Sequence, residues 1–317
     1  MNLKQLTVAT VCIGSMLASC QKEKPMTTQQ ATKQSLKAAT TIGSFFVANQ
    51  NNATQYFLVD PQLGATLTGS QGTQMIIAPG AFVSGSNPVT AQVQVALVEN
   101  YTLSNMLLNN MSTESLLGEA IVTGGSFIID FSTQSGVPVT FAPGTINMVV
   151  PAANTGGIDP GMTLWKGVAS IIQSGDNAWS DQGNAPQLAG TTYDFPLIPG
   201  EKWVNVDRRF FGDISDLRVV MPQGFDLSNT SVFVAMNGVK NMLTSLDVYT
   251  EGNNSFSEPI PFSAPGQQGH IIAVTVKDGI LRTKIQPFTV SPNQVIQLSN
   301  LTANTVAGLQ DQIDALP

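Results

Sequence analysis

Hydrophobic and polar positions alternate over short runs along most of the chain, and this period of two is typical of β-strands. In the clearest run, 92–98, the residues Val93, Val95 and Leu97 are apolar and share one side of the predicted strand. We therefore expect one face of this strand to be buried. Similar short apolar or β-branched runs, each bounded by turn residues, predict strands at 74–77, 91–98, 127–131, 145–150 and 162–165.

A second group of such runs begins after residue 213, with candidates at 217–221, 231–236, 246–249, 269–277, 281–288 and 294–298. Asp278-Gly279 lies between two apolar runs and is a strong signal for a two-residue hairpin turn. Helical patterns are scarce: 103–115 is either a short helix or an exposed loop, and 305–316 has the spacing of a helix. The chain is thus predicted to be all-β, with two antiparallel β-sandwich domains.

The first 25 residues have a different pattern, which predicts export and lipid attachment. A polar start containing Lys4 precedes an apolar run at 6–16 that is too short to span a bilayer. The run ends in Leu17-Ala18-Ser19-Cys20, which resembles the lipobox of bacterial lipoproteins. That resemblance implies removal of residues 1–19 and a diacylated cysteine at position 20, with palmitate-type chains. The alternative is an ordinary secretory signal with an incidental cysteine.

Residues 20–40 are predicted to be a linker between the lipid and the folded part. The segment is rich in Gln, Lys and Thr and lacks apolar periodicity, so it has little surface to bury. No Asp directly follows Cys20, and this favours the outer membrane over retention in the inner membrane. The sequence leaves open whether the protein faces the periplasm or the cell surface. The other cysteine, Cys12, lies in the predicted signal peptide, so no disulfide is expected in the mature protein.

Charge excludes one class of partner. Only 11% of the residues are charged, and the net charge is −7. A weakly acidic chain with scattered charges lacks the basic surface that nucleic acid requires, so no nucleic-acid partner is expected. The lipid is the predicted membrane attachment, and no cofactor is expected, because Gly124-Gly125 is not followed by the Lys-Ser/Thr of a phosphate-binding loop.

The order of turns and strands between residues 69 and 151 has a recognisable layout. A strand breaks at Pro79-Gly80-Ala81, a second strand and a polar excursion follow, and Gly124-Gly125 and Pro143-Gly144 punctuate the rest. This order resembles the ZU5 domain, a β-sandwich, and more closely the ZU5-like module of bacterial surface lipoproteins. The resemblance extends over 41–212 and includes segments like Met162–Trp165, an Asn-x-Trp turn at Asn177–Trp179 and Trp203–Arg208.

The resemblance implies a structural or protein-interaction module rather than an enzyme. Some related proteins cut themselves at a His-Phe-Ser site, but this chain has Asp130-Phe131-Ser132 there, so self-cleavage is not expected. The expected organisation is a signal peptide (1–19), a lipidated linker (20–40), a ZU5-like sandwich (41–212), a small immunoglobulin-like or transthyretin-like sandwich (213–302) and a short C-terminal helix (303–317).

Catalytic chemistry has few candidate residues. The chain has 1 His, His270, and no Gly-x-Ser-x-Gly elbow, so neither a hydrolytic triad nor a zinc site of the usual kind is predicted. A glycosidase needs only two carboxylates, and the available acids are Glu99, Glu114, Glu119, Asp130, Asp159, Asp176, Asp181 and Asp207. None of them stands in a recognisable motif, so no catalytic residue is assigned.

Two candidate ligand sites each have a structural alternative. Oxygen ligands at 176–184, from Asp176 to Asp181, can ring a calcium ion, but the spacing is not that of an EF-hand and a polar loop with a docked tryptophan is favoured. Trp165 and Trp179, with Trp203, are candidates for a sugar-stacking platform or for core positions. The sequence therefore predicts a non-catalytic envelope lipoprotein, with a glycan-binding accessory protein and a carboxylate hydrolase as alternatives.

Overall fold

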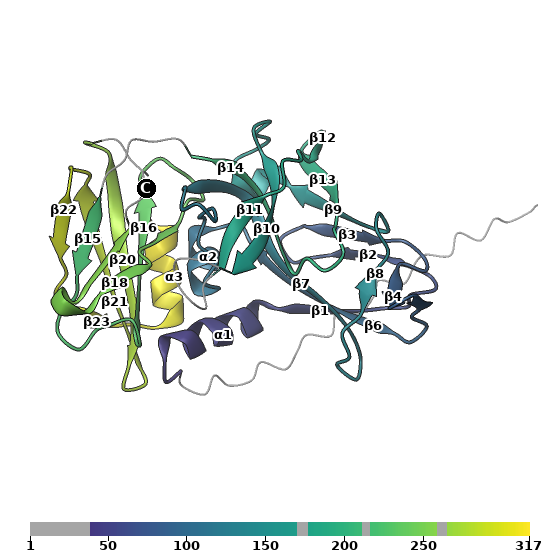
Figure 1. Ribbon diagram of the computed structural model, residues 1–317, viewed down its shortest axis with the longest axis horizontal. Coiled ribbons are helices and arrows are strands. Elements are labelled where there is room, and N and C mark those ends of the chain that lie inside the picture. The colour runs from purple at the N-terminus through teal and green to yellow at the C-terminus, as the bar shows by residue number, and fades with distance from the viewer. Residues whose placement is uncertain (1–38, 170–176, 211–215, 259–264) are drawn as a thin grey trace, which may run out of the picture.

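The computed structural model describes residues 39–169, 177–210, 216–258 and 265–317 (Figure 1). The described chain consists mainly of β-strands in antiparallel sheets, as the alternating pattern predicted. None of the described sheets combines strands from before residue 210 with strands from after residue 216. The predicted boundary at 212/213 itself lies outside the described residues.

The N-terminal sandwich, defined here as the β-structure between residues 55 and 209, has two main sheets. One has the order β1-β6-β7-β14-β10-β11, formed by Gln55–Val59, Val93–Asn100, Ile121–Thr133, Trp203–Arg209, Thr163–Ala169 and Asn177–Asp181. The other has the order β12-β13-β9-β3-β2, formed by Gln187–Ala189, Thr192–Pro196, Ile146–Pro151, Gln74–Ile77 and Ala65–Thr68. A small third sheet, β5-β4-β8, is formed by Asn87–Pro88, Phe82–Ser84 and Thr140–Phe141.

The core of this sandwich explains the alternation in the sequence. Val93, Val95 and Leu97 on β6 are buried and belong to one apolar cluster with Met75 of β3 and Met148 of β9. Apolar side chains at every second position thus fill the space between the two main sheets. The predicted orientation of this strand is confirmed.

The C-terminal sandwich, defined here as the β-structure between residues 217 and 303, also has two sheets. The first has the order β18-β19-β15-β22, formed by Val248–Thr250, Ser255–Glu258, Leu217–Val220 and Gln294–Gln297. The second has the order β17-β16-β20-β21-β23, formed by Thr244–Ser245, Thr230–Met236, Gln268–Lys277, Ile280–Thr289 and Thr302–Ala303. One pair departs from the antiparallel expectation, because β15 and β22 run parallel.

The hairpin predicted at Asp278-Gly279 is confirmed. These two residues connect β20 to β21, whose last pair is Lys277 with Ile280. Asp278 has φ 55° and Gly279 has φ 70°, the positive values that a two-residue turn between twisted antiparallel strands requires.

Three α-helices are present in the described residues: α1 (Ile42–Ala53), α2 (Leu103–Leu108) and α3 (Val306–Asp314), with short 3-10 turns at Ala152–Thr155 and Glu251–Asn253. Sequence reasoning did not predict α1, which starts the segment assigned to a β-sandwich. Its start is fixed by Thr41, whose hydroxyl accepts a hydrogen bond from the Ser44 backbone N–H, and the Ser44 hydroxyl in turn accepts one from the Thr41 N–H. Its buried positions Ile42, Phe45 and Phe46 form a helical stripe.

The segment 103–115, predicted to be either a helix or an exposed loop, begins with α2 and is buried. Met106 and Leu107 have no measurable exposure, and the Thr102 hydroxyl accepts a hydrogen bond from the Asn105 backbone N–H at the start of the helix. The exposed-loop alternative is therefore wrong for this helix. At the C-terminus α3 buries Leu309 and Ile313, which have the predicted helical spacing.

The helices lie between the two sandwiches and form a third apolar core, which we call the interface core (Figure 1). It is defined by Ile42, Phe45, Phe46, Val98, Met106, Leu107, Leu108, Met111, Ile121, Ile128, Trp165, Trp179, Phe233, Ala235, Leu243, Ile272, Val274, Val276, Leu309 and Ile313. Strand β20 is consequently buried on both faces: Ile271 and Ala273 face the C-terminal sandwich core, and Ile272 and Val274 face the interface core. This explains why its sequence is almost continuously apolar.

Candidate functional site

The two tryptophans considered as possible ligand contacts are buried. Trp165 is 1% exposed and Trp179 is 2% exposed, both within the interface core. The Trp165 Nε1 donates to the Asp207 carbonyl oxygen at 3.1 Å, and the Trp179 Nε1 donates to the Ser112 carbonyl oxygen at 2.8 Å. Of the two alternatives for these residues, the structure supports core positions and not a sugar platform, because α1, α2 and the C-terminal sandwich cover the sheet face that carries them.

The Asn-x-Trp segment is also not a turn. Residues Asn177–Asp181 form β11, which pairs with β10 in an antiparallel register. Trp179 additionally bridges to Ser115 in the loop after α2. The indole is therefore fixed by backbone pairing on two sides, which suits a core position rather than an adaptable binding site.

The third tryptophan, Trp203, lines an open groove of about 560 Å³. It is only partly buried, at the start of β14, and the neighbouring strand β10 contributes Lys166, Gly167 and Val168. The loop between β13 and β14 provides the rest of the lining, which includes Ile198, Pro199, Gly200, Glu201 and Lys202. We call this site the Trp203 groove. The signal in the sequence that points to it is the Pro199-Gly200 turn directly before the strand.

One charge that lines the Trp203 groove is in an ion pair. Lys202 Nζ lies 2.9 Å from Asp130 Oδ2. Burial raises the pKa of the Glu201 carboxyl above its ordinary value, and the nearby Lys166 ammonium opposes that rise.

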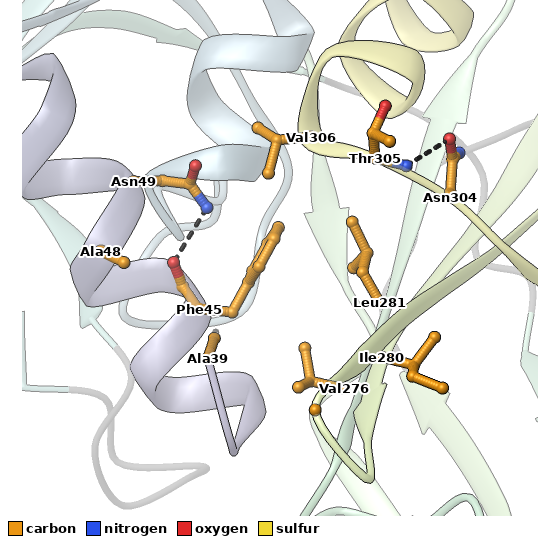
Figure 2. Close-up of a pocket in the computed structure, with 11 residues that line it drawn as sticks. Ala39, Phe45, Ala48, Asn49, Val276, Ile280, Leu281, Asn304, Thr305 and Val306 are labelled. Carbon is orange, nitrogen blue, oxygen red and sulfur yellow. Dashed lines mark hydrogen bonds between the residues drawn. The ribbon is translucent and has the colours of Figure 1, made fainter. Parts of the chain in front are cut away.

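A second concave site, which we call the α1 crevice, lies where α1 faces the C-terminal sandwich and α3 (Figure 2). It measures about 330 Å³, and its apolar lining comes from Phe45 of α1, Val276 and Leu281 of the β20–β21 hairpin, and Val306 of α3. Figure 2 shows the Phe45 ring extending from α1 toward the facing strands. The crevice has the shape and lining to receive an apolar side chain.

The polar groups beside the α1 crevice are already hydrogen-bonded. Asn49 Nδ2 donates to the Phe45 carbonyl oxygen at 2.9 Å, and the Thr305 backbone N–H donates to Asn304 Oδ1 at 2.8 Å (Figure 2). Because these groups are paired within the protein, the apolar surface dominates what the crevice can bind.

His270 lies on β20 and is partly buried. Burial lowers the pKa of its imidazole. Its buried Nδ1 has no hydrogen-bond partner among the described residues. A Ser-His-Asp arrangement requires a carboxylate bonded to that nitrogen, and the described surroundings of His270 do not provide one.

The candidate carboxylates are distributed among structural contacts. Glu99 accepts hydrogen bonds from Gln55 Nε2 at 2.8 Å and from the backbone N–H groups of Gln71 at 3.0 Å and Thr73 at 3.2 Å. It therefore holds the turn between β2 and β3 against β1 and β6. Glu114 is buried in the loop after α2. Neither of them lines the Trp203 groove or the α1 crevice.

Further acids form ion pairs with the two arginines at the end of β14. Arg209 lies 3.3 Å from Glu119 and 3.7 Å from Asp181, with its guanidinium 5.7 Å from the centre of the Trp165 ring. Arg208 lies 2.6 Å from Asp159. These pairs are partly exposed, so each contributes little to stability by itself, but they hold the two arginine side chains in place.

The calcium arrangement considered at Asp176–Asp181 is only partly described, because Asp176 lies outside the described residues. Asp181 Oδ1 accepts a hydrogen bond from the Gly183 backbone N–H at 2.8 Å, and Oδ2 faces Arg209. A metal cation bound to Asp181 would lie close to the positively charged guanidinium of Arg209, which would repel it. Within the described ranges, no group of three or more His, Cys, Asp or Glu residues is placed to hold a metal ion.

Asp207 is the most deeply buried acid of this region. Asn205 Nδ2 donates to its Oδ2, while its Oδ1 has no partner within the described structure. Burial raises the pKa of the Asp207 carboxyl well above its ordinary value, and a hydrogen bond with Thr123 opposes that rise.

Comparison with known proteins finds no protein family whose model matches the chain and no similar curated protein. The resemblance to ZU5-like modules therefore stays a prediction. The lipobox residues Leu17, Ala18, Ser19 and Cys20 lie outside the described residues. Among the described helices, none combines the length and the apolar character needed to cross a membrane.

Sequence reasoning missed both concave sites. The α1 crevice is formed by residues more than 200 positions apart, such as Phe45 and Leu281, and α1 itself was not predicted. The Trp203 groove depends on which of the three tryptophans stays only partly buried, and that is decided by the packing of the two sandwiches.

Proposed function

We propose that this chain is a lipid-anchored protein of the bacterial cell envelope that acts as a non-catalytic structural or protein-interaction module. The anchor is proposed at Cys20, because Leu17-Ala18-Ser19-Cys20 follows a short apolar run at the N-terminus. Two or three acyl chains on one cysteine hold a protein firmly on a membrane. The outer membrane is the proposed location.

The observation that carries the interaction function is the interface core. It joins two sandwiches through apolar side chains from α1, α2, α3 and one sheet of each sandwich. The shared burial favours a fixed arrangement of the sandwiches over independent motion. A rigid body of this kind presents constant surfaces to a partner, which suits a scaffold or docking protein.

The α1 crevice is the proposed contact point for an envelope protein. Its lining is apolar, and Ile280 at its edge is 43% exposed. Ala39, the first described residue, also lines it. The proposed linker therefore joins the folded part of the protein beside the crevice. The crevice is then close to the point from which the chain leads to the proposed lipid anchor. An apolar side chain of the partner is the proposed occupant.

The anchor is tested by comparing Cys20→Ser with Cys12→Ser in cells fed an alkyne-labelled fatty acid. We expect label on the wild type and on Cys12→Ser, and none on Cys20→Ser. Unprocessed Cys20→Ser protein is expected because lipidation precedes cleavage in lipoproteins. Label that persists on Cys20→Ser would refute lipidation at this cysteine.

The interaction is tested in the native envelope with a photo-crosslinking residue that replaces Ile280. The control carries the same residue in place of Leu117, which is 76% exposed and does not line the crevice. We expect one discrete protein adduct from position 280 only. Replacing Val306 by Asp in the crevice should abolish that adduct. Equal adducts from both positions, or no effect of Val306→Asp, would contradict the proposed contact point.

A further inference from the structure

The turn after β16 contains the single Asn-Gly pair of the sequence, Asn237-Gly238. The backbone nitrogen of a residue that follows asparagine can attack the side-chain amide, and glycine obstructs this attack least because it has no Cβ. Proximity within one dipeptide makes the attack effective. Gly238 has φ 74°, a value that favours glycine. The residue that makes the pair reactive is therefore also the residue that the turn requires.

Neither reacting group of this pair is held by the protein. The Gly238 backbone N–H and the Asn237 side-chain amide have no hydrogen-bond partner among the described residues. The turn is closed by the Val239 N–H, which donates to the Met236 carbonyl oxygen at 3.2 Å. Gly238 is exposed, and a Cβ atom there would meet nothing within 4 Å. Water and the moving side chain can therefore both reach this nitrogen.

Asn254-Ser255 is a comparable pair whose groups are held. Asn254 Nδ2 donates to the carbonyl oxygens of Met221 at 2.9 Å and Pro222 at 2.8 Å. Its Oδ1 accepts a hydrogen bond from the Tyr249 hydroxyl at 2.8 Å. Ser255 begins β19 and is fully buried. Attack at Asn254 would first have to break these bonds, so this pair serves as an internal control.

The segment after the Asn237 turn connects the two sandwiches. The Asn241 carbonyl oxygen accepts a hydrogen bond from the Thr123 backbone N–H of β7 at 3.1 Å. Val239, directly after the pair, packs against the core of the C-terminal sandwich. A change in the main chain at Asn237 is thus only a few residues away from a contact between the sandwiches.

We propose that Asn237 is a site of spontaneous deamidation, at which the protein is modified slowly with age. The Gly238 nitrogen forms a bond to Asn237 Cγ, and the side-chain nitrogen leaves as ammonia with the proton of the Gly238 N–H. The product is a cyclic succinimide. Water then opens the ring at either carbonyl carbon and gives aspartate or isoaspartate. This modification goes beyond the proposed anchoring and docking function and does not depend on it.

The isoaspartyl product loosens the contact between the sandwiches. It carries a new carboxylate and inserts an extra carbon into the main chain beside Val239. The longer main chain moves the Asn241 carbonyl relative to the Thr123 N–H, so the hydrogen bond between them is weakened. Ageing of the protein thus acts at the joint that otherwise holds the two sandwiches in a fixed arrangement.

The reaction is tested by incubating the purified full chain at mildly alkaline pH, where loss of the Gly238 N–H proton is easier, and by mapping its peptides with mass spectrometry. We expect conversion at Asn237 well before conversion at Asn254, with isoaspartate detected by enzymatic methyl labelling. Asn237→Gln should slow conversion about 100-fold, because the longer side chain displaces the amide carbon from the attacking nitrogen. Conversion at Asn237 no faster than at Asn254 would overturn the proposal.

Amide hydrogen exchange tests the effect on the joint. The Thr123 amide should exchange faster in aged wild type than in fresh protein, while the Ile129 amide, which donates to the Lys202 carbonyl oxygen within the N-terminal sandwich, should be unchanged. Asn237→Gln and Asn237→Ser, each shown to be folded by circular dichroism, should age without this change. Unchanged exchange at Thr123 in fully converted protein would refute the loosening of the joint.

Discussion

The side chain of Thr113 exchanges hydrogen bonds with the backbone of Leu243, although the two residues are 130 positions apart. Its hydroxyl accepts from the Leu243 N–H at 2.8 Å and donates to the Leu243 carbonyl at 3.2 Å. The Thr113 backbone N–H donates to the same carbonyl at 2.7 Å. The loop after α2 is thereby bonded to the start of β17, so polar contacts as well as the interface core join the two sandwiches.

Replacing Thr113 by Val should destabilise the protein by about 1–3 kcal/mol, because it leaves the buried Leu243 N–H without an acceptor. Thr113→Ser keeps the hydroxyl and should cost less. Urea unfolding followed by circular dichroism measures both. A loss of stability for Thr113→Ser as large as that for Thr113→Val, or larger, would contradict the dominant role of the hydroxyl.

Phe46 connects α1 to the C-terminal sandwich through an edge-on contact with Phe233, with ring centres 6.3 Å apart. Phe46→Ala should lower the free energy of unfolding by about 3–5 kcal/mol, because it leaves a cavity in the interface core. The adjacent Val47 is 57% exposed, so Val47→Ala is the matched control and should be nearly neutral. Differential scanning calorimetry compares them, and similar melting temperatures for the two variants would contradict this role of α1.

Asp207 should make stability depend on pH. Its pKa is raised in the folded state by burial, so the folded protein binds this proton more tightly than the unfolded chain does. The resulting stabilisation is complete below the unfolded pKa, about 3.9, and is lost as pH rises through the folded pKa. Asp207→Asn stays neutral, so its stability relative to wild type should rise from pH 4 to pH 8.

Urea unfolding at several pH values measures this difference. Asp130→Asn is the control, because Asp130 forms an exposed ion pair with Lys202. If the stability difference between Asp207→Asn and wild type is the same at pH 4 and pH 8, the carboxyl does not titrate as the structure requires.

Two glycines should respond to alanine in opposite directions. Gly167→Ala introduces a Cβ against Trp203 and should cost about 1–3 kcal/mol through overpacking. Gly43→Ala lies in α1, where an added Cβ has nothing within 4 Å, and should stabilise by up to about 1 kcal/mol. Thermal unfolding of both variants gives the signs; a stable Gly167→Ala with unchanged tryptophan emission would show that Trp203 is not seated on β10.

The sequence by itself determined the all-β class, because strand periodicity is local. Val93, Val95 and Leu97 face the core as their spacing required, and Asp278-Gly279 forms the predicted hairpin. The short-range helical spacing of Leu309 and Ile313 likewise matches α3. Alternation and turn chemistry depend only on neighbouring residues, so they are readable before any long-range contact is known.

Only the tertiary structure decided which apolar residues became core and which stayed at a surface. Trp165, Trp179 and Trp203 look alike in the sequence, yet α1 and the second sandwich bury the first two and leave the third beside a groove. The pairing of β15 with β22 in parallel is likewise set by chain segments far apart. Burial is a property of how distant elements pack together, and no local pattern contains that information.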